Sequence, residues 1–393
     1  MSNLSLVRLG DVCQTTSGGT PSRVRKDFYG GDIPWIKSGD LTGGLVNAWG
    51  ECITEAGLKN SSAKLFKPGT LLIAMYGATV GKLGILEVEA ATNQAICGIT
   101  PGAGIDTLYL FYFLLHRQKY LIGQSIGGAQ PNISQKVIRE LRIPVPLMAE
   151  QHRIVNILKR ADRIRRLRKQ AQDTARQLIP ALFIDMFGDP VANLNGWNIK
   201  PLKEVADIGS GVTKGRKLDG HRTIELPYLA VSNVQDGYLN LSKVKSIRIK
   251  PTEIEKYKVI PGDFLMTEGG DPDKLGRGAI WNGEIDVCLH QNHIFKVRCK
   301  RELLLPEYLK SLVGSRYGKG YFLRVAKQTT GIASINKTQL GKFPVLVPPI
   351  ELQNDFVARV EGIQSIIGQQ EAAQASAESS FQSLLSRAFT GKL

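Results

Sequence analysis

The chain has no long apolar run, few cysteines and no compact set of catalytic residues. None of its apolar runs approaches the roughly 18 residues that a membrane span needs, and its first residues, MSNLSLVRLGDV, lack the charged-then-apolar layout of a signal peptide. Its five cysteines are odd in number and form no C-x-x-C pair, so we expect reduced thiols. The sequence therefore predicts a folded cytoplasmic protein with no membrane partner.

Motifs that would carry chemistry are absent or incomplete. The stretch 77–84 resembles a phosphate-binding loop, but it has three residues between its first two glycines instead of four, and Leu83 stands where a metal-binding Ser or Thr should be. No acidic residue has a lysine two positions later, as a common type of metal-dependent nuclease would require. Cys288, His290 and His293 have no second cluster to complete a metal site. We therefore expect no catalytic residue, metal or cofactor in this chain.

What the sequence has in excess is positive charge. The formal net charge is +16, divided as +3 over residues 1–150, +5 over 151–189, +10 over 190–350 and −2 over 351–393. A basic balance of this size is typical of proteins that bind a polyanion. Nucleic acid is favoured over a membrane because no basic amphipathic membrane helix stands out. A basic protein without such a partner is the alternative.

The two halves of the chain, 1–190 and 194–393, repeat the same landmarks in the same order. Corresponding segments are IPWI at 33–36 and LPYL at 226–229, Ser17-Gly18 and Ser210-Gly211, KPGTLL at 67–72 and IPGDFL at 260–265, and Val145-Pro146 and Val347-Pro348. Such repetition indicates a duplicated half-molecule. A chain built in this way presents two similar surfaces.

Each half is predicted to be a mixed α/β domain followed by a long helix. Short strand-like runs separated by glycine and polar turns occur at 33–36, 70–75, 228–231 and 263–266. Helical segments rich in leucine, tyrosine and basic residues follow at 108–121 and 306–313.

The two long helices carry apolar or tolerant residues at alternating steps of three and four, which is a coiled-coil seam. The first seam comprises Ile154, Ile157, Ala161, Ile164, Arg168, Ala171, Ala175, Leu178 and Leu182, and the second comprises Phe356, Val360, Ile363, Ile367, Gln370, Gln374, Ala377, Phe381, Leu384 and Ala388. Arg168, Gln370 and Gln374 would be acceptable there if the helices meet and satisfy one another. A basic first helix and a slightly acidic second favour an antiparallel pair. Solvated charged faces are the alternative, and Pro180 should end or kink the first helix.

Polar loops after the predicted strands supply candidates for contacts with DNA bases. Amide side chains can bond adenine bidentately, and lysine or arginine can bond guanine. The candidates are Lys37, Ser38, Asp40, Tyr76, Asn93, Gln94, Gln130, Asn132 and Ser134 in the first half, and Ser232, Asn233, Gln235, Glu268, Lys274, Arg277, Gln291, Asn292, Thr329, Asn336 and Lys337 in the second. Because equivalent loops carry different polar groups, the two halves would suit two different short sequences. A structural role is the alternative for each residue taken singly.

Several segments carry a resemblance to a known family. They are SGGTPS at 17–22, GDIPWI at 31–36, the Pro-Gly turn at Pro68, the proline-rich lead into Gln151 and the ending SLLSRAFTG at 383–391. Together with the duplication, these segments resemble the DNA-specificity subunit of type I restriction-modification systems over the whole chain. The second half departs from the pattern, since Val212 stands at the family's second glycine and Lys214 at its proline.

The resemblance implies two target-recognition domains, at 1–149 and 190–349, followed by conserved helices at 150–189 and 350–393. Each domain would read one half of a split double-stranded DNA site. Two methyltransferase subunits, and then restriction (motor-nuclease) subunits, would assemble around the chain, with the helices as their platform. Catalysis would belong to those partners, which would use S-adenosylmethionine, ATP and Mg.

Helix geometry sets an expected limit on the gap between the two half-sites. A helix over 150–179 would be about 45 Å long, which separates two reading surfaces by at most roughly 13 base pairs.

One rival hypothesis is a scaffold or anti-restriction protein that binds methyltransferase subunits without reading DNA. A second is an RNA-binding module, although the sequence shows no aromatic stacking platform.

Overall fold

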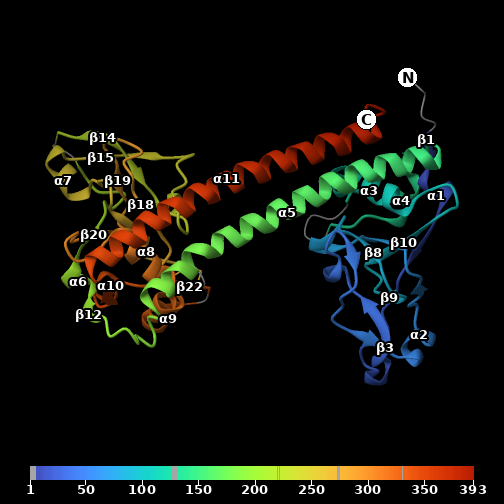
Figure 1. Ribbon diagram of the computed structural model, residues 1–393, viewed down its shortest axis with the longest axis horizontal. Coiled ribbons are helices and arrows are strands. Elements are labelled where there is room, and N and C mark those ends of the chain that lie inside the picture. Colours follow the sequence, from blue (N-terminus) through green and yellow to red (C-terminus); the bar gives the residue numbers. More distant parts are fainter. Residues whose placement is uncertain (1–5, 126–130, 219, 221, 272–274, 330) are drawn as a thin grey trace. The chain divides into compact units, whose positions relative to one another are not determined.

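The computed structural model describes residues 6–125, 131–218, 220, 222–271, 275–329 and 331–393. The chain divides into two units: unit 1 consists of Met1–Gln170 with Ala372–Leu393, and unit 2 of Ala171–Glu371. Each unit contains parts of both long helices, α5 (Met148–Phe187) and α11 (Ile350–Phe389) (Figure 1). Of the helices in these described ranges, none is long and apolar enough to cross a membrane.

Unit 1 is built on two main sheets, with strand orders β2-β10-β7-β8-β4 and β5-β3-β9-β6, and on the pair β1-β11. Its strands are β1 (Leu6–Arg8), β2 (Cys13–Ser17), β3 (Tyr29–Ile36), β4 (Leu45–Val46), β5 (Cys52–Ile53), β6 (Leu65–Phe66), β7 (Leu71–Ala74), β8 (Leu83–Leu86), β9 (Ala90–Thr92), β10 (Ile96–Pro101) and β11 (Arg142–Pro144). Its other helices and 3-10 turns are α1 (Leu9–Val12), α2 (Glu55–Lys59), α3 (Thr107–Gly123), α4 (Gln135–Glu140), η1 (Lys26–Phe28), η2 (Ser38–Asp40) and η3 (Gly77–Thr79).

Unit 2 repeats this plan. Its sheets have the orders β13-β20-β16-β18, β15-β14-β19, β17-β22-β21 and β12-β23. Its strands are β12 (Asn198–Pro201), β13 (Ala206–Ser210), β14 (Ile224–Leu229), β15 (Lys245–Ile249), β16 (Phe264–Thr267), β17 (Gly269–Gly270), β18 (Gly278–Ile280), β19 (Leu289–His290), β20 (Ile294–Cys299), β21 (Lys327–Thr329), β22 (Ile332–Ser334) and β23 (Pro344–Val347). Its other helices and 3-10 turns are α6 (Leu202–Val205), α7 (Ile254–Tyr257), α8 (Pro306–Gly314), α9 (Arg316–Val325), α10 (Lys337–Gly341), η4 (Val231–Asn233) and η5 (Pro251–Glu253).

The duplication predicted from the sequence is confirmed by the strand pairing. The order β13-β20-β16-β18 matches β2-β10-β7-β8, strand for strand along the chain. Strand β3 pairs in parallel with β9, placing Trp35 beside Ala91, and β14 pairs in parallel with β19, placing Tyr228 beside Leu289. The predicted mixed α/β fold is therefore present in both units.

Each long helix carries a buried glutamine in its first turn. The side-chain amide of Gln151 donates to two backbone carbonyl groups at 2.8 and 2.9 Å, and its oxygen accepts from the amide of Asp106 at 3.0 Å. Gln353 makes the same set of bonds in unit 2, at 3.0, 2.9 and 2.9 Å. Both side chains are fully buried, so these bonds satisfy groups that would be costly to leave unpaired. They fix where α5 and α11 start.

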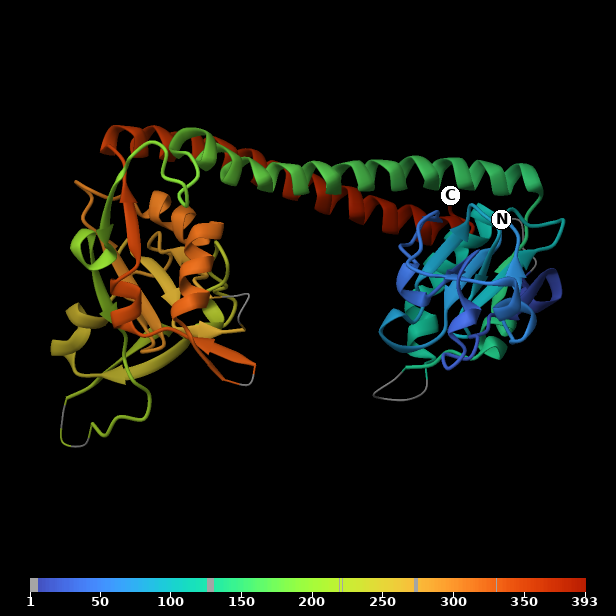
Figure 2. The same ribbon diagram turned by 90° about the horizontal axis from the view of Figure 1, so that it is seen from below.

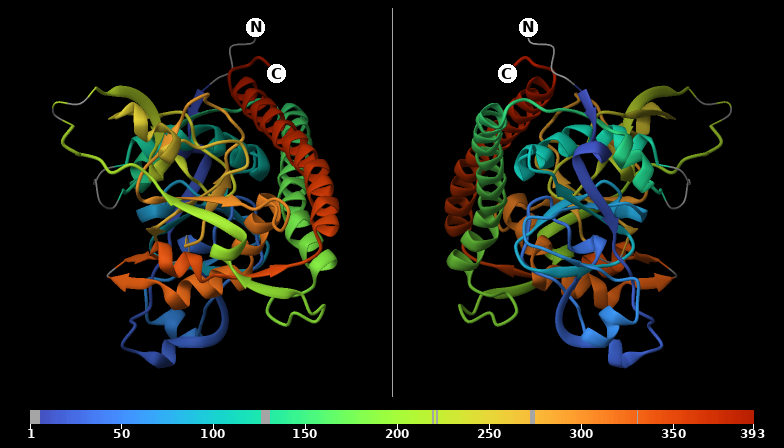
Figure 3. Two further views of the ribbon diagram at one scale, coloured as in Figure 1. Left: turned by 90° about the vertical axis from the view of Figure 1, so that its left-hand side faces the viewer. Right: turned by 90° about the vertical axis from the view of Figure 1, so that its right-hand side faces the viewer.

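The helices pack antiparallel, as the sequence predicted, because the start of one meets the end of the other in each unit (Figure 2, Figure 3). The core of unit 1 contains Ile154, Val155 and Leu158 of α5 with Phe381, Leu385 and Ala388 of α11. The core of unit 2 contains Phe183 and Phe187 of α5 with Phe356 and Val360 of α11. Ion pairs join the helices as well, Arg165 to Glu378 at 3.4 Å in unit 1 and Arg176 to Glu371 at 2.7 Å in unit 2.

The predicted seam of α11 is confirmed, since each of its predicted positions is buried or half-buried. The predicted seam of α5 is wrong in its middle. Ile164 and Leu178 are 55% and 40% exposed, and Arg168 and Ala171 are also exposed. Asp162 and Gln172 are buried instead.

The buried carboxylate explains the shift in α5. Asp162 Oδ1 accepts from Arg165 at 2.7 Å, and Oδ2 pairs with Arg166 at 2.8 Å. A buried charge that is paired in this way can stand in a seam where an unpaired one cannot. The expected pairing of Arg168 with the two glutamines is also wrong: the side-chain oxygens of Gln370 and Gln374 are buried and have no hydrogen-bond partner among the described residues.

Pro180 does not end the first helix. α5 continues through Pro180 to Phe187 as one helix. A proline inside a helix removes one backbone hydrogen bond. The residues that follow it, Phe183 and Phe187, are each 2% exposed in the core of unit 2. Their burial compensates for the missing bond and carries the helix past the proline.

Candidate nucleic-acid interface

Three backbone hydrogen bonds bring the candidate residues of unit 1 together. The amide of Asn93 donates to the carbonyl of Ile36 at 3.0 Å, and that of Met75 donates to Ala95 at 2.7 Å. The carbonyl of Met75 accepts from Ile133 at 2.9 Å. The ends of β3, β7 and β9 and the segment before α4 therefore lie side by side. We call residues 37–40, 76–79, 92–95 and 131–134 loop cluster 1.

Unit 2 has the same three bonds at the equivalent positions. The amide of Gln291 donates to Leu229 at 2.9 Å, and that of Glu268 donates to His293 at 3.0 Å. The carbonyl of Glu268 accepts from Ile335 at 2.9 Å. We call residues 230–235, 268–270, 290–293 and 334–337 loop cluster 2.

The two clusters share a backbone but differ in their side chains. At equivalent places, cluster 1 has Lys37, Tyr76, Asn93 and Gln94, and cluster 2 has Ala230, Gly269, Gln291 and Asn292. Except for Ala230 and Gly269, these side chains are polar or aromatic, and all of them are at least partly exposed. One scaffold thus presents two different patterns of hydrogen-bonding groups.

A repeated glycine allows each cluster to form. The backbone after β2 passes so close to β9 that a Cβ atom on Gly18 would meet Thr92 and lie 2.5 Å from the carbonyl oxygen of Asn93. A Cβ atom on Gly211 would meet the backbone of His290 and lie 2.5 Å from the carbonyl oxygen of Gln291. Real Cβ atoms essentially never approach other atoms this closely. The glycine of the Ser-Gly pair seen in both halves is therefore required by packing.

Val212 fits at the place of the second glycine of the first half. Gly19 donates its amide to the carbonyl of Thr92 at 2.9 Å, and Val212 donates to that of His290 at 2.8 Å. The side chain of Val212 is fully buried against Tyr228 and its neighbours. The departure from the family pattern therefore preserves the backbone path.

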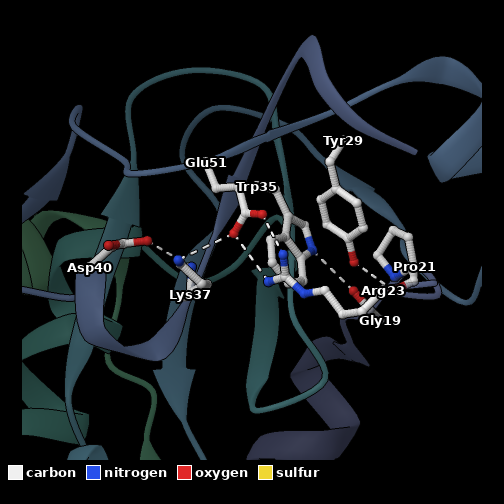
Figure 4. Close-up of polar contacts among 8 residues, drawn as sticks. All are labelled: Gly19, Pro21, Arg23, Tyr29, Trp35, Lys37, Asp40 and Glu51. Carbon is white, nitrogen blue, oxygen red and sulfur yellow. Dashed lines mark hydrogen bonds and ion pairs between the residues drawn. The ribbon is translucent and has the colours of Figure 1, made fainter. Parts of the chain in front are cut away.

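Arg23 forms a charged network at the edge of loop cluster 1 (Figure 4). Its guanidinium carbon lies 4.4 Å from the ring centroid of Tyr29 and 5.1 Å from that of Trp35. Arg23 is also paired with Glu51, which Lys37 Nζ approaches at 3.3 Å. The hydrogen bond from Arg23 lowers the pKa of Glu51, and the hydrogen bond from Lys37 contributes a smaller shift in the same direction. The carboxylate thus holds two cations in place beside the loops.

Arg23 was not among the residues predicted from the sequence. It follows directly on the SGGTPS segment, and the arginine next to that motif was a signal. Its aromatic and acidic partners lie 6, 12 and 28 positions further along the chain, so the network is visible only in the fold.

Asn233 is removed from the candidates by its burial. It is 3% exposed, its oxygen accepts from the amide of Ala230 at 2.8 Å, and its amide donates to two backbone carbonyl groups at 2.7 and 3.0 Å. Asp40 occupies the equivalent place in unit 1, where Oδ2 accepts from the amide of Lys37 at 2.8 Å. Both residues shape a turn, and Asn233 has no group left to contact DNA.

Two further candidates cap short helices. The Ser134 hydroxyl accepts from the amide of Val137 at 3.3 Å at the start of α4, and Asn336 Oδ1 accepts from Gln339 at 2.9 Å at the start of α10. Both side chains are exposed. Their primary role is therefore structural.

The remaining candidates are distributed as follows. Partly or fully exposed are Lys37, Ser38, Tyr76, Asn93, Gln94, Asn132, Ser232, Gln235, Glu268, Arg277, Gln291, Asn292 and Lys337. Gln130 and Lys274 lie outside the described residues, and Thr329 ends β21, where only its backbone is described. Within cluster 2, Glu268 accepts from His293 Nδ1 at 2.6 Å, which orients the carboxylate.

Loop cluster 2 begins one of its segments with a buried histidine. His290 is fully buried, its Nδ1 donates to the carbonyl of Tyr257 at 2.9 Å, and its Nε2 has no partner among the described residues. Burial lowers the pKa of His290 to about 4, and the neighbouring charge of Lys296 contributes in the same direction. The ring is therefore neutral at pH 7.

Unit 2 is expected to lose stability in acid because of His290. In the unfolded chain the ring takes up a proton as the pH falls through about 6.5, whereas in the folded unit it does so only near 4. The free energy of unfolding should therefore fall by about 3 kcal/mol between pH 7 and pH 4 through this group. Urea unfolding of the wild type and of His290→Asn, across that range, measures the difference. An equal loss of stability in both proteins would contradict the assignment.

The comparisons with known proteins agree with this geometry. Residues 1–176 match the family described as the type I restriction modification DNA specificity domain. The chain is 26% identical over 340 residues to the type I restriction enzyme MjaIX specificity subunit of Methanocaldococcus jannaschii, covering 78% of each chain. It is 25% identical over 406 residues to the EcoKI specificity subunit of Escherichia coli K12, covering 94% of this chain and 83% of the relative.

Solved structures share the fold over nearly the whole chain. The type I restriction-modification S subunit from M. genitalium aligns with a TM-score of 0.55 at 16% identity, covering 99% of this chain and 97% of the other. A chain from a study of assembly and conformational transition of the type I R-M system aligns with a TM-score of 0.61 at 20% identity, covering 99% and 98%. The duplicated plan, the repeated loop clusters and these relatives agree with one another. Residues 1–176 match the DNA specificity domain of type I restriction-modification systems, and the chain is similar over most of its length to the specificity subunits of these systems.

Proposed function

We propose that the chain recognises a split double-stranded DNA site, with loop cluster 1 reading one half-site and loop cluster 2 the other. The observation that carries the proposal is the pair of clusters with one backbone and two sets of side chains. A common backbone suits the common shape of duplex DNA, and different side chains suit different bases. The net charge of +16 favours binding to phosphates.

The chemistry of the exposed side chains fits readout in the major groove. Gln94, Gln291 and Asn292 carry amides, which can donate to and accept from adenine. Arg23 and Lys37 supply positive charge at the edge of cluster 1, where phosphates or guanine would be contacted. The proposed reading therefore combines base contacts inside each cluster with cations at the rim.

The proposed partners are two methyltransferase subunits and, around them, restriction subunits. Ile164, Leu167 and Leu178 of α5 are 55%, 54% and 40% exposed, although they are apolar and lie on the helix expected to serve as a platform. We assign these side chains to contacts with partners. Methylation and cleavage, with S-adenosylmethionine, ATP and Mg, belong to the partner subunits, and this chain is not an enzyme. We propose that the complex acts in the cytoplasm.

The experiment that tests the function is a map of methylated adenine. The chain is co-expressed with its neighbouring methyltransferase subunit, and N6-methyladenine is mapped across the host genome by single-molecule sequencing. The expected result is one motif made of two short half-sites with a fixed unread gap. An intact complex with a competent methyltransferase but no motif would favour the scaffold hypothesis.

Lengthening α5 is expected to lengthen the gap without changing either half-site. Four residues inserted after Gln170, where the helix passes from unit 1 to unit 2, extend a helix by about 6 Å. The gap should grow by about one to two base pairs. The control is the same insertion after Leu194, which is 90% exposed in the loop that follows α5. An unchanged gap in the first variant, or the same change in both, would argue against a helical spacer.

A further inference from the structure

Unit 2 contains a cavity of about 530 Å³ beside the last turns of α5. Its size falls within the range of small-molecule sites, which is about 300–1,000 Å³. The residues that line it include Ile179, Pro180 and Phe183 of α5, Phe264 of β16, and Lys310 and Ser311 of α8. Its wall is mostly apolar and includes no residue of loop cluster 2.

The duplication shows which residues of unit 1 occupy the equivalent place. α5 and α11 both have 40 residues, so their positions correspond in order, and Ile179 of α5 corresponds to Phe381 of α11. Tyr109 of α3 corresponds to Tyr308 of α8. Each donates its hydroxyl to a carbonyl group of the strand before the long helix, at 2.9 and 3.0 Å. These two matches fix the correspondence between the units.

Unit 1 is filled with aromatic rings at these positions. Two and three residues after the matched tyrosine, α3 has Phe111 and Tyr112. Phe111, Tyr112 and Phe381 are 4%, 4% and 0% exposed. The ring centroids of Phe111 and Tyr112 lie 5.4 Å apart, and those of Tyr112 and Phe381 lie 6.4 Å apart. Unit 2 has Lys310, Ser311 and Ile179 in their place, and all three line the cavity.

Two of the polar groups that line the cavity, those of Lys310 and Ser311, already have partners within the protein. Lys310 Nζ donates to the carbonyl of Gly237 at 3.2 Å, and the carboxylate of Asp236 lies close enough to offset its charge. The Ser311 hydroxyl donates to the carbonyl of Glu307 at 3.0 Å. A ligand gains little from offering hydrogen bonds or charge to these two side chains, and most of the remaining wall is apolar. An apolar and uncharged ligand is therefore favoured over a sugar or a phosphate.

We propose that this cavity binds a small uncharged aromatic molecule, whose ring occupies the place that Phe111, Tyr112 and Phe381 fill in unit 1. The ring packs against Ile179 and Phe183, on either side of Pro180. This is the turn of α5 that lacks a backbone hydrogen bond. Apolar protein cavities of smaller size stay dry and bind benzene, so the class of ligand is one that such a site accepts.

Indole is the probe for a first test on the full chain with its isoleucine methyl groups labelled. We expect the methyl signal of Ile179 to shift in a saturable way as indole is added, whereas that of Ile154, in the core of unit 1, stays in place. Calorimetry should give one site per chain. No saturable shift of Ile179 up to the solubility limit of indole would overturn the proposal.

Two filling variants restore the residues of unit 1, Ile179→Phe and Ser311→Tyr. Both should raise the melting temperature and weaken indole binding at least tenfold. Gln177→Phe, at an exposed position of α5, and Ser311→Ala, which keeps the cavity open, are controls that should bind indole as the wild type does. Undiminished binding in both filling variants would also overturn the proposal. If either variant does not fold, the wild-type methyl signals decide alone.

Discussion

Replacing Gly211 with alanine is expected to lower the free energy of unfolding of unit 2 by about 3 kcal/mol or more. The added Cβ atom would meet the backbone of His290 and the carbonyl oxygen of Gln291, and backbone atoms cannot move aside as a flexible side chain can. The segment that follows β13 would have to move away from His290, which would break the hydrogen bond from the Val212 amide to the His290 carbonyl. Urea unfolding followed by fluorescence measures the loss.

Gly320 provides the matched control in the same unit. It lies within α9, and a Cβ atom there meets nothing within 4 Å. Gly320→Ala should therefore be neutral or stabilise the protein by up to about 1 kcal/mol, through helix propensity. Gly18→Ala should reproduce the large loss in unit 1, because the same close approach recurs there. If Gly211→Ala and Gly320→Ala have equal stability, the packing explanation of the repeated glycine is wrong.

Replacing Gln291 with alanine is expected to lower the preference for the correct base at one position of a half-site by about 10- to 100-fold. Gln291 is partly exposed in loop cluster 2, and no hydrogen bond from its side chain is formed within the described residues. A bidentate amide contact to a base contributes about 1–3 kcal/mol to the choice of that base. Methylation maps of Gln291→Ala should therefore show one degenerate position in the half-site read by unit 2.

The reciprocal variant in unit 1 is the control for this prediction. Gln94 holds the position in cluster 1 next to the equivalent of Gln291, and Gln94→Ala should relax only the other half-site. Each variant thus controls for the other, since both are glutamine-to-alanine changes in the same protein. Weakening of both half-sites by either variant would mean that the clusters do not act separately.

The seam of α11 could be predicted from the sequence, whereas that of α5 could not. α11 has one stripe of apolar and small residues, so only one register places them inside. α5 has apolar residues on two adjacent stripes, and the choice depends on Asp162. This carboxylate is buried because Arg165 and Arg166 pair with it. The spacing of apolar residues alone does not reveal such an ion pair. The sequence pattern therefore predicts Ile164 in the seam.

The candidate site was predicted as a set of loops but not in its details. Loop positions follow from the ends of strands, and these were visible in the alternation of apolar residues. The burial of Asn233 depends on carbonyl groups 7 and 10 residues away in a turn, and the network of Arg23 depends on rings brought near by the sheet. Polar residue types are therefore enough to locate the surface. The fold is needed to distinguish a side chain that could contact a base from one that stabilises a turn or a helix end.

Unit 2 is inserted within unit 1, since Ala171–Glu371 separates two segments of a single core. Phe381, Leu385 and Ala388, which complete the core of unit 1, are synthesised after the whole of unit 2. On the ribosome, the first domain to emerge must therefore wait for the last turns of the chain before it can close. A truncation that removes residues 372–393 would accordingly damage the unit at the opposite end of the gene, and leave unit 2 with all of its own residues.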